Sequence, residues 1–421
     1  MSIARALSHR NYRLFFAGQG LSLVGTWMQR IAVSWLVYRL TGSPFLLGFV
    51  GFAGQIPTFL FASFAGVLID RSSRYRVLLI TQTLATIQSA LLALLTLTGY
   101  VNVWHIFVLQ FSLGLINAFD MPARQSFVVD LLEREEDLPN AIALNSMMVN
   151  GARLAGPALA GIVVSLLREG LCFFLNSLSF LAIIIALLLM KIEKERRKSP
   201  RSHPWHDLKE GFRYAYRFAP IRYMLLLLCL IAVMGMPFQI LMPVFARDIL
   251  HGGPHTLGFL MGTVGVGALI AALYLAARKT VVGLGRTAAF MCFLFGLGLI
   301  AFSLSRKIVL SFIAILFGGF GMMGTMTSCN TIIQTVVDDE KRGRVMGFYV
   351  MAAFGMAPFG SLLAGSLASH IGAPNTVLLG GISCILASLL FAMKLPVFRK
   401  AVHPIYVAKK IVRTQGAPDG I

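Results

Sequence analysis

Long, uninterrupted apolar runs are the feature that most constrains the fold of this 421-residue chain. Charges and Gly/Pro turns separate twelve such runs, each of about the length that crosses a bilayer as a helix. The runs do not alternate apolar and polar residues, as strands of a membrane barrel would. A backbone in lipid must satisfy its hydrogen bonds within helices or closed barrels, so the sequence predicts an all-α membrane protein with twelve transmembrane helices. The approximate limits are 14–38, 45–69, 77–98, 104–128, 141–166, 171–190, 222–246, 256–277, 287–305, 308–335, 345–369 and 375–395.

Composition and charge placement support this class. The chain is 57% hydrophobic and only 13% charged, whereas a soluble domain carries about 25% charged residues. The net charge of +20 does not indicate nucleic-acid binding, because the basic residues gather in alternate connections between apolar runs. By the positive-inside rule, we expect both termini on the cytoplasmic side and a basic inner face in contact with membrane lipids.

The two halves of the chain repeat. Two six-helix bundles in the same orientation, related by a pseudo-two-fold axis along the membrane normal, would produce this pattern. We therefore expect bundles at 1–190 and 222–395, a cytoplasmic linker at 191–221 with a short amphipathic helix, and a basic cytoplasmic tail at 396–421. At an offset of 204 residues the matches are Gly114 with Gly318, Gly151 with Gly355, Gly156 with Gly360 and Gly161 with Gly365, while Pro44-x-x-Leu47-Gly48-Phe49 matches Pro254-x-x-Leu257-Gly258-Phe259.

Asp120 is an acidic residue well inside an apolar run. It lies on the first arm of a hairpin from Trp104 to Leu167, and an ionisable residue at such depth suggests a functional site. Arg124 follows one turn later, and Arg153 lies at a similar depth on the second arm. Two interpretations remain open: a carboxylate that exchanges protons by changing partner, or a fixed pair with Arg153 or Arg124. Arginine cannot deprotonate, so these arginines would act electrostatically.

A charged motif joins the second and third runs. It reads Gly66-x-x-x-Asp70-Arg71-x-x-Arg74, with Gly66 suited to close helix contact and Asp70 in need of a cationic partner. With twelve runs and a duplicated half, this motif resembles the major facilitator superfamily, although Ser73 and Tyr75 depart from the usual pattern. The charge cluster would latch the cytoplasmic side in one conformation, and an ordinary positive-inside loop is the alternative. The resemblance implies that the first, fourth, seventh and tenth helices line a central cavity. Arg30, Asp120 and Arg124 would then face that cavity.

The fifth run carries a second motif, with Gly151, Gly156, Pro157 and Gly161. Proline permits a bend, and the glycines permit tight packing. The motif resembles that of the superfamily's antiporters and drug exporters, which favours export; a kinked packing helix in a transporter of either direction is the alternative. The stretch from Asn117 to Gln125 further resembles the branch that contains the enterobactin exporter and the macrolide efflux permeases.

Polar and sulfur-containing side chains on the expected cavity helices are candidates for substrate contact, although they could serve only packing. Such a surface suits an adaptable amphipathic ligand. No hydrolase, nucleotide-binding or metal-ligand motif occurs, so we expect neither an enzyme nor a metal site. The candidates are Gln29, Met236, Gln239, Thr325 and Asn330, and those for proton coupling are Asp120, Arg124, Arg153 and Arg30.

These observations predict a secondary active transporter of the bacterial inner membrane, driven by an ion gradient and without a cofactor. We expect a monomeric proton-coupled exporter, an antiporter, of an amphipathic drug or siderophore that works by alternating access. An uptake symporter of the same fold and a lipid flippase are the alternatives.

Overall fold

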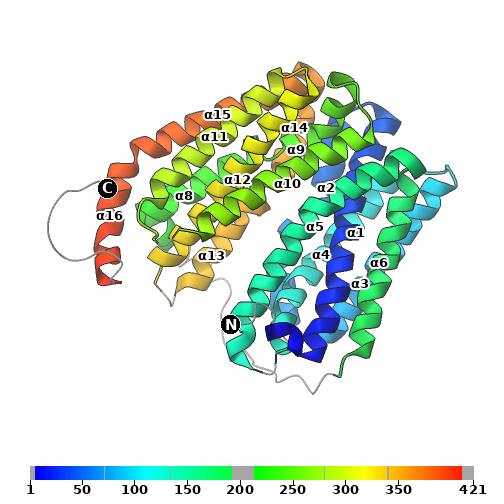
Figure 1. Cartoon of the computed structure of the whole chain (residues 1–421), viewed down its shortest axis with the longest axis horizontal. Coiled ribbons are helices and arrows are strands. Elements are labelled where there is room, and N and C mark those ends of the chain that lie inside the picture. Colours follow the sequence, from blue (N-terminus) through cyan, green and yellow to red (C-terminus); the bar gives the residue numbers. More distant parts are fainter. Residues whose placement is uncertain are drawn as a thin grey trace. The chain divides into compact units, whose positions relative to one another are not determined.

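The computed structural model describes residues 5–70, 72–132, 134–191, 213–278, 280–338 and 341–409, and every regular element in these ranges is helical (Figure 1). Eleven of the helical stretches in these ranges are long and apolar enough to cross a membrane. Helix α1 (Arg10–Thr41), which carries more polar side chains, covers the remaining predicted run. The predicted all-α membrane fold is confirmed.

The chain divides into two compact units. The first comprises Met1–Pro200 with Ile240–Gly262, and the second comprises Arg201–Gln239 with Thr263–Ile421. In the first unit, α1 packs against α5 and α6, α2 against α4, and α3 against α4 and α6. Besides α1, its elements are η1 (Arg5–Ser8), α2 (Pro44–Asp70), α3 (Arg74–Leu97), α4 (Val103–Asp130), η2 (Glu135–Asp137), α5 (Leu138–Leu167) and α6 (Glu169–Leu189).

Local sequence explains where several of these helices begin and end. Gly42, with φ of 59°, ends α1 in the left-handed conformation that glycine adopts without strain. The Ser73 side chain accepts from the Arg76 amide and caps α3, and Asn102 forms a capping box with His105 at the start of α4. These caps fix the starts of the two helices that hold Asp120 and its partners.

The turn between α4 and α5 is tied to the N-terminal segment. His9 Nε2 lies 2.9 Å from Asp137 Oδ2, and the Tyr12 hydroxyl donates to the Ala141 carbonyl at 2.9 Å. The hydrogen bond with His9 and the charge of Arg5 hold the pKa of the Asp137 carboxyl below its usual value. Asp137 is therefore an anion at neutral pH and anchors the start of α5.

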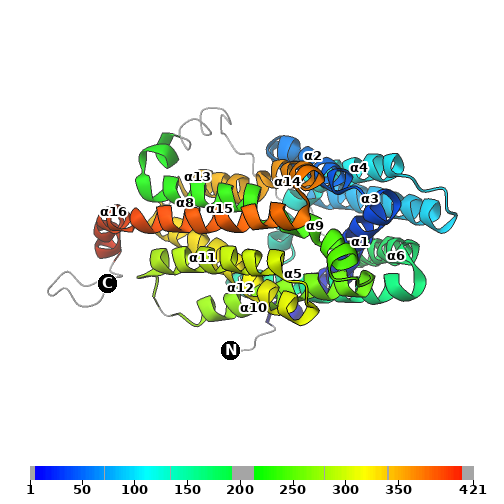
Figure 2. The same ribbon diagram turned by 90° about the horizontal axis from the view of Figure 1, so that it is seen from above.

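The second unit uses the same kind of packing, with several interrupted helices. Helix α11 packs against both α12 and α15, as Figure 2 shows. The π-helical turns η3 and η6 interrupt two long helices, an irregularity that often marks functional regions. The elements after residue 212, of which residues 240–262 belong to the first unit, are α8 (Ala219–Leu230), η3 (Ile231–Gly235), α9 (Phe238–Val244), η4 (Phe245–Ile249), α10 (Pro254–Ala276), α11 (Leu284–Leu304), α12 (Ile308–Val336), α13 (Arg342–Val350), η6 (Met351–Gly355), α14 (Ala357–Ile371), α15 (Ala373–Met393) and α16 (Leu395–Ala408).

The sequence repeat corresponds to repeated close contacts within the two units. A Cβ at Gly114 would lie 2.5 Å from the Gly54 carbonyl, so α2 and α4 touch through backbone atoms. In the second unit the tight position is Gly319, against the Val264 carbonyl at 2.3 Å, and not Gly318. The tight contact of Gly114 thus has its counterpart at Gly319, while Gly318 lies against Gly298, whose added Cβ would be 2.8 Å from the Gly318 nitrogen.

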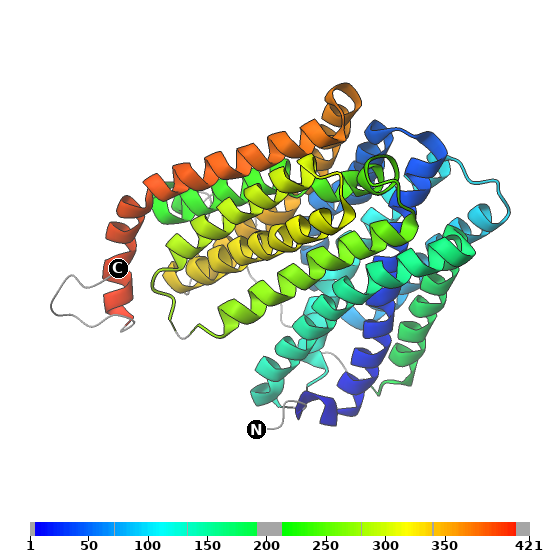
Figure 3. The ribbon, with the colours of Figure 1, turned by 45° about the horizontal axis from the view of Figure 1, so that its top comes forward.

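Most of the predicted linker, residues 192–212, lies outside the described residues, including the start of its expected amphipathic helix. The tail, predicted only as a basic segment, contains α16 (red in Figure 3). Its buried face is formed by Leu395, Phe398, Val402 and Tyr406, and Lys409 Nζ donates to the Thr335 carbonyl at 2.7 Å. Residues 410–421 lie outside the description.

Candidate functional site

The Asp120 carboxylate is buried between α3 and α4, with 2% of the residue exposed. Its Oδ1 accepts hydrogen bonds from Thr81 Oγ1 at 2.9 Å and from Gln82 Nε2 at 2.6 Å. Its Oδ2 forms an ion pair with Arg124, one turn along the same helix. Of the two partners left open by the sequence, the structure pairs Asp120 with Arg124.

This geometry stabilises the ionised carboxylate, because every contact supplies a donor or a positive charge. Protonation of Asp120 would remove the charge that neutralises Arg124, a partly buried cation whose Nε already lacks a hydrogen-bond partner. The pair can therefore couple proton uptake to movement of a guanidinium group. Both members lie one turn apart on α4, so a fixed ion pair is the alternative interpretation.

Gln29 lies in a buried polar network that joins α1, α3 and α6. Its Oε1 accepts from Asn176 Nδ2 at 2.8 Å and contacts Ser89 Oγ at 2.7 Å, and its Nε2 donates to Gln88 Oε1 at 3.1 Å. Only 2% of Gln29 is exposed. The structure places this expected substrate-contact residue in the interior of the first unit, where it connects three helices.

Arg30 and Arg153 both lie near one aromatic ring, that of Trp27. The Arg30 guanidinium carbon lies 4.5 Å from the centroid of Trp27, and that of Arg153 lies 5.4 Å from it. Arg30 is exposed and Arg153 half-buried. The structure thus separates the four coupling candidates into two groups: Asp120 with Arg124, and Arg30 with Arg153.

The motif between α2 and α3 is described in part. Arg71 and the side chain of Asp70 lie outside the described residues. Arg74 Nη1 pairs with the Asp130 carboxylate on α4 at 2.8 Å and donates to the Ser126 carbonyl at 3.3 Å. Gly66 borders open space among the described residues, so the close helix contact expected at Gly66 is not found in this structure.

The α5 motif makes close contacts at two of its three glycines. A Cβ at Gly156 would lie 2.5 Å from Trp27 Cβ, and one at Gly161 would lie 3.0 Å from the Pro254 carbonyl, within the same unit. Pro157 lies inside the helix. Gly151 faces open space among the described residues, so its expected packing role is not found here.

The candidates of the second unit do not form one cluster of hydrogen bonds among the residues that the structure describes. Gln239 Nε2 contacts Met322 Sδ at 3.8 Å, and Asn330 Oδ1 accepts from Gln334 Nε2 at 2.6 Å. Thr325 is fully buried and donates to the Gly321 carbonyl of its own helix. Met236 is half-buried after the π-helical turn η3.

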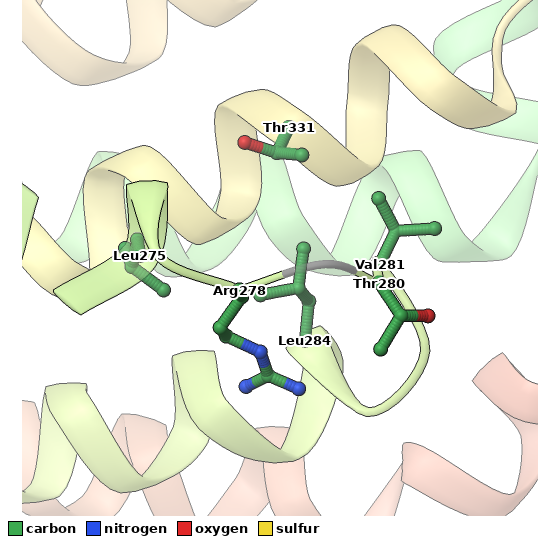
Figure 4. A pocket seen from close by; sticks show the side chains of 6 residues that line it. All are labelled: Leu275, Arg278, Thr280, Val281, Leu284 and Thr331. Carbon is green, nitrogen blue, oxygen red and sulfur yellow. The ribbon is translucent and has the colours of Figure 1, made fainter. Parts of the chain in front are cut away.

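A small pocket of about 120 Å³ lies where α10 is followed by α11, and none of these candidates lines it (Figure 4). Arg278 lines it but bonds to Thr287 Oγ1 at 2.6 Å and to the Val282 carbonyl at 2.9 Å. The Arg278 guanidinium therefore stabilises the chain between α10 and the start of α11. The other lining residues are Leu275, Thr280, Val281, Leu284 and Thr331.

Sequence reasoning missed the partners that α3 contributes. Thr81 and Gln82 hold Asp120, while Gln88 and Ser89 hold Gln29. The signal was available, because these two polar pairs recur seven residues apart within an otherwise apolar run and so share a helix face. It also missed Asp130 as the partner of Arg74, and Trp27 as the contact of Arg153.

Comparison with known proteins agrees with this architecture. The chain is 27% identical to the Staphyloferrin A transporter of Staphylococcus aureus over 90% of its length and 95% of that protein. It is 26% identical to the Multidrug efflux pump Tap of Mycolicibacterium fortuitum, over 86% and 88% of the two chains. It is 24% identical to Macrolide efflux protein A of Streptococcus pyogenes, over 90% and 95%.

A solved structure shows the same fold, and a family model identifies the family. The crystal structure of the nucleoside transporter NupG matches 94% of this chain and 99% of its own with a TM-score of 0.68, which at 14% identity shows the fold alone. The model of a family described as transmembrane secretion effector matches residues 2–411. Its relatives are membrane transporters and not enzymes, and the predicted resemblance is confirmed. The chain belongs to the transmembrane secretion effector family of major facilitator transporters.

Proposed function

We propose that this membrane transporter is a proton-coupled exporter of amphipathic small molecules and that Asp120 is its coupling carboxylate. The observation that carries the proposal is the buried Asp120, whose ionised form is held by Arg124, Thr81 and Gln82. The names of the relatives support drugs or siderophores as the substrate class. The chain would act as a monomer in the bacterial inner membrane, with both termini in the cytoplasm and no cofactor.

The coupling follows from the two states of one carboxylate. When ionised, Asp120 fixes the Arg124 guanidinium and keeps α3 bonded to α4 through Gln82. When protonated, it keeps a neutral hydrogen-bonding group but loses the ion pair, so Arg124 can turn toward another anion or water. A proton entering from outside would thus favour one conformation, and its release inside would favour the other.

Transport in vesicles of both orientations tests the proposal. Everted vesicles with an imposed proton gradient should accumulate a macrolide, ethidium or a siderophore from a test panel, and a protonophore should abolish the accumulation. Accumulation only in right-side-out vesicles would contradict export and favour uptake. A lack of any proton-linked flux or ligand-induced thermal shift across the panel would favour a lipid flippase.

The Asp120→Asn variant tests the coupling residue. We expect its proton-driven flux to fall to the background of empty vesicles, while expression stays normal, because an amide keeps the shape but cannot exchange a proton. Glu169→Gln is the matched control, since Glu169 is equally buried, at 2% exposed, and pairs with Arg39 at 2.7 Å. Normal coupled flux in Asp120→Asn would remove Asp120 as the proton carrier.

A further inference from the structure

Arg30 and Arg153 form a concentrated positive charge within the first unit. They come from different helices, α1 and α5, yet both guanidinium groups contact the indole of Trp27. Two like charges beside one ring repel each other, and neither has the competing option of losing its proton. An anion that binds beside both guanidinium groups would reduce this repulsion and lower the free energy of the site.

No carboxylate supplies that anion among the described residues. The acidic side chains of the first unit that form ion pairs or carboxylate hydrogen bonds do so elsewhere: Asp120 pairs with Arg124, Asp130 with Arg74, Asp137 with His9, Glu169 with Arg39, and Asp248 with the Tyr38 hydroxyl. Arg30 and Arg153 form no ion pair in the described part of the chain, and the buried Nε of Arg153 lacks a hydrogen-bond partner. Within the described ranges, the two cations are thus left without a protein counter-ion.

Helix packing holds the two arginines together. Gly156 lies directly against Trp27, with a distance of 2.5 Å from its hypothetical Cβ to Trp27 Cβ. Gly20 of α1 similarly lies near Met148 of α5. The close approach of α1 and α5 therefore brings Trp27 within reach of both guanidinium groups, and all three residues of the site lie on helices.

The exposed Arg30 side chain shows that the site is open on one side. A charged side chain within a membrane span faces a water-filled cavity or the protein interior, because exposure to lipid is costly. Guanidinium groups bind carboxylates and other oxyanions through paired N–H donors, and an indole offers a flat apolar surface beside them. An anionic amphiphile matches both features.

We propose that Arg30, Arg153 and Trp27 bind a carboxylate or other oxyanion of the transported substrate, with an apolar part of the same molecule lying on the indole. The substrate is thus an organic anion and not a cationic drug. This inference rests on the proposed function, since it assigns the substrate class of the proposed exporter.

Equilibrium binding to the full-length protein in lipid nanodiscs tests the inference. Three probes share one ring system and differ in charge: 1-pyrenebutyrate, its neutral amide and 4-(1-pyrenyl)butylammonium. Energy transfer from tryptophan to pyrene, with empty nanodiscs subtracted, reports binding. We expect the carboxylate to bind about tenfold more tightly than the amide, and the ammonium most weakly.

Variants show whether the two arginines cause this preference. In the double variant Arg30→Gln with Arg153→Gln, the carboxylate and the amide should bind equally. Arg30→Lys with Arg153→Lys should keep the preference, because the charges remain. Arg306→Gln is the control, since the Arg306 guanidinium donates to the Ser303 and Ser305 carbonyls, in the second unit. Thermal unfolding checks that each variant is folded.

Three results would overturn the inference: equal affinity of the wild type for carboxylate and amide, an unchanged preference in the double Gln variant, or its loss in a folded double Lys variant. The binding measurement uses no ion gradient. A failure of proton-driven export would therefore leave a measured anion preference intact, and a missing preference would leave the vesicle experiment to decide the proposed function separately.

Discussion

The interior of the first unit contains buried carboxylate and amide side chains, whereas the described interior of the second is largely apolar. Among the described residues, the buried amide and carboxylate side chains all lie in the first unit, while the buried polar side chains of the second are all serine or threonine. Four of these hydroxyls bond to carbonyls of the preceding turn, those of Ser303, Thr325, Ser361 and Thr376, whereas the Ser388 hydroxyl donates to the Ala289 carbonyl of α11. Apolar groups such as Cys292, Phe295 and Cys384 fill the rest of the second interior.

The two kinds of interior differ in whether their buried polar groups need hydrogen-bond partners on other helices. A hydroxyl that donates a hydrogen bond to a carbonyl of the preceding turn adds little connection between helices. A buried amide or carboxylate needs partners from elsewhere, as Gln29 and Asp120 do. Close helix contacts therefore occur in both units, whereas the buried carboxylate and amide groups of the described residues lie in the first.

The largest effect that we predict from this comparison concerns two glutamines separated by 210 residues, the same separation as Pro44 and Pro254. Gln29→Leu should lower the free energy of unfolding by about 2–4 kcal/mol, because Asn176 and Gln88 would lose a buried partner. Gln239→Leu should change it by less than about 1 kcal/mol, since it loses only a long contact to sulfur. Chemical denaturation followed by circular dichroism measures both.

An effect of Gln29→Leu as small as that of Gln239→Leu would show that the polar network adds no stability to the first unit. The two interiors would then differ in the chemical groups that they bury and not in the stability that these groups provide.

A second prediction concerns the packing that both units share. Gly156→Ala and Gly360→Ala should each destabilise by about 1–3 kcal/mol, because the added Cβ would lie 2.5 Å from Trp27 Cβ and 2.7 Å from the Ala232 carbonyl. Gly151→Ala is the control and should be neutral or stabilising by up to about 1 kcal/mol, since its Cβ meets open space. Thermal unfolding compares the three.

Only Gly156→Ala should also weaken binding of 1-pyrenebutyrate, because it displaces Trp27. A similar weakening in Gly360→Ala would mean that helix packing in general, and not the contact at Trp27, controls the anion site.

The smallest predicted effect concerns Arg74 and Arg278, which are 204 residues apart. Arg74→Gln removes an ion pair with Asp130 in which both side chains are about one-third exposed, so it should cost no more than about 1 kcal/mol. High salt should remove most of that difference by screening the pair. Arg278→Gln should be insensitive to salt, because its partners Thr287 and Val282 are neutral. Chemical denaturation at low and high salt measures the stability of both variants. Equal salt responses would contradict the assignment of Arg74 to an ion pair and of Arg278 to neutral partners.

Sequence patterns predicted the class of fold because hydrophobic length and charge placement are properties of single helices. They singled out Asp120 for the same reason, since a carboxylate within an apolar run is visible without a structure. They could not choose between Arg124 and Arg153, because similar depth does not specify which face of a helix meets another. Sequence patterns assigned Gln29 to a cavity because they do not show which face of a helix meets another helix. The burial of Gln29 depends on contacts from α3 and α6, far away in the sequence.

The glycine patterns also could not predict which glycines contact a neighbouring helix. Gly66 and Gly156 look alike in sequence, but of these two only Gly156 has a neighbouring helix, among the described residues, close enough to exclude a side chain. Whether a glycine permits a contact depends on the second helix, which no pattern around the glycine specifies.

The most direct test of the central claim is the number of protons that the protein exchanges when it binds a substrate identified in everted vesicles. At a pH low enough to protonate Asp120 in part of the substrate-free protein, the purified transporter in a weakly buffered solution with a pH indicator should release protons on binding in the wild type, because the substrate would favour the state in which Asp120 is ionised. We predict that Asp120→Asn binds the same compound without this release, while Glu169→Gln releases protons as the wild type does. Equal release by the wild type and by Asp120→Asn would contradict the account and identify Asp120 and Arg124 as a fixed pair.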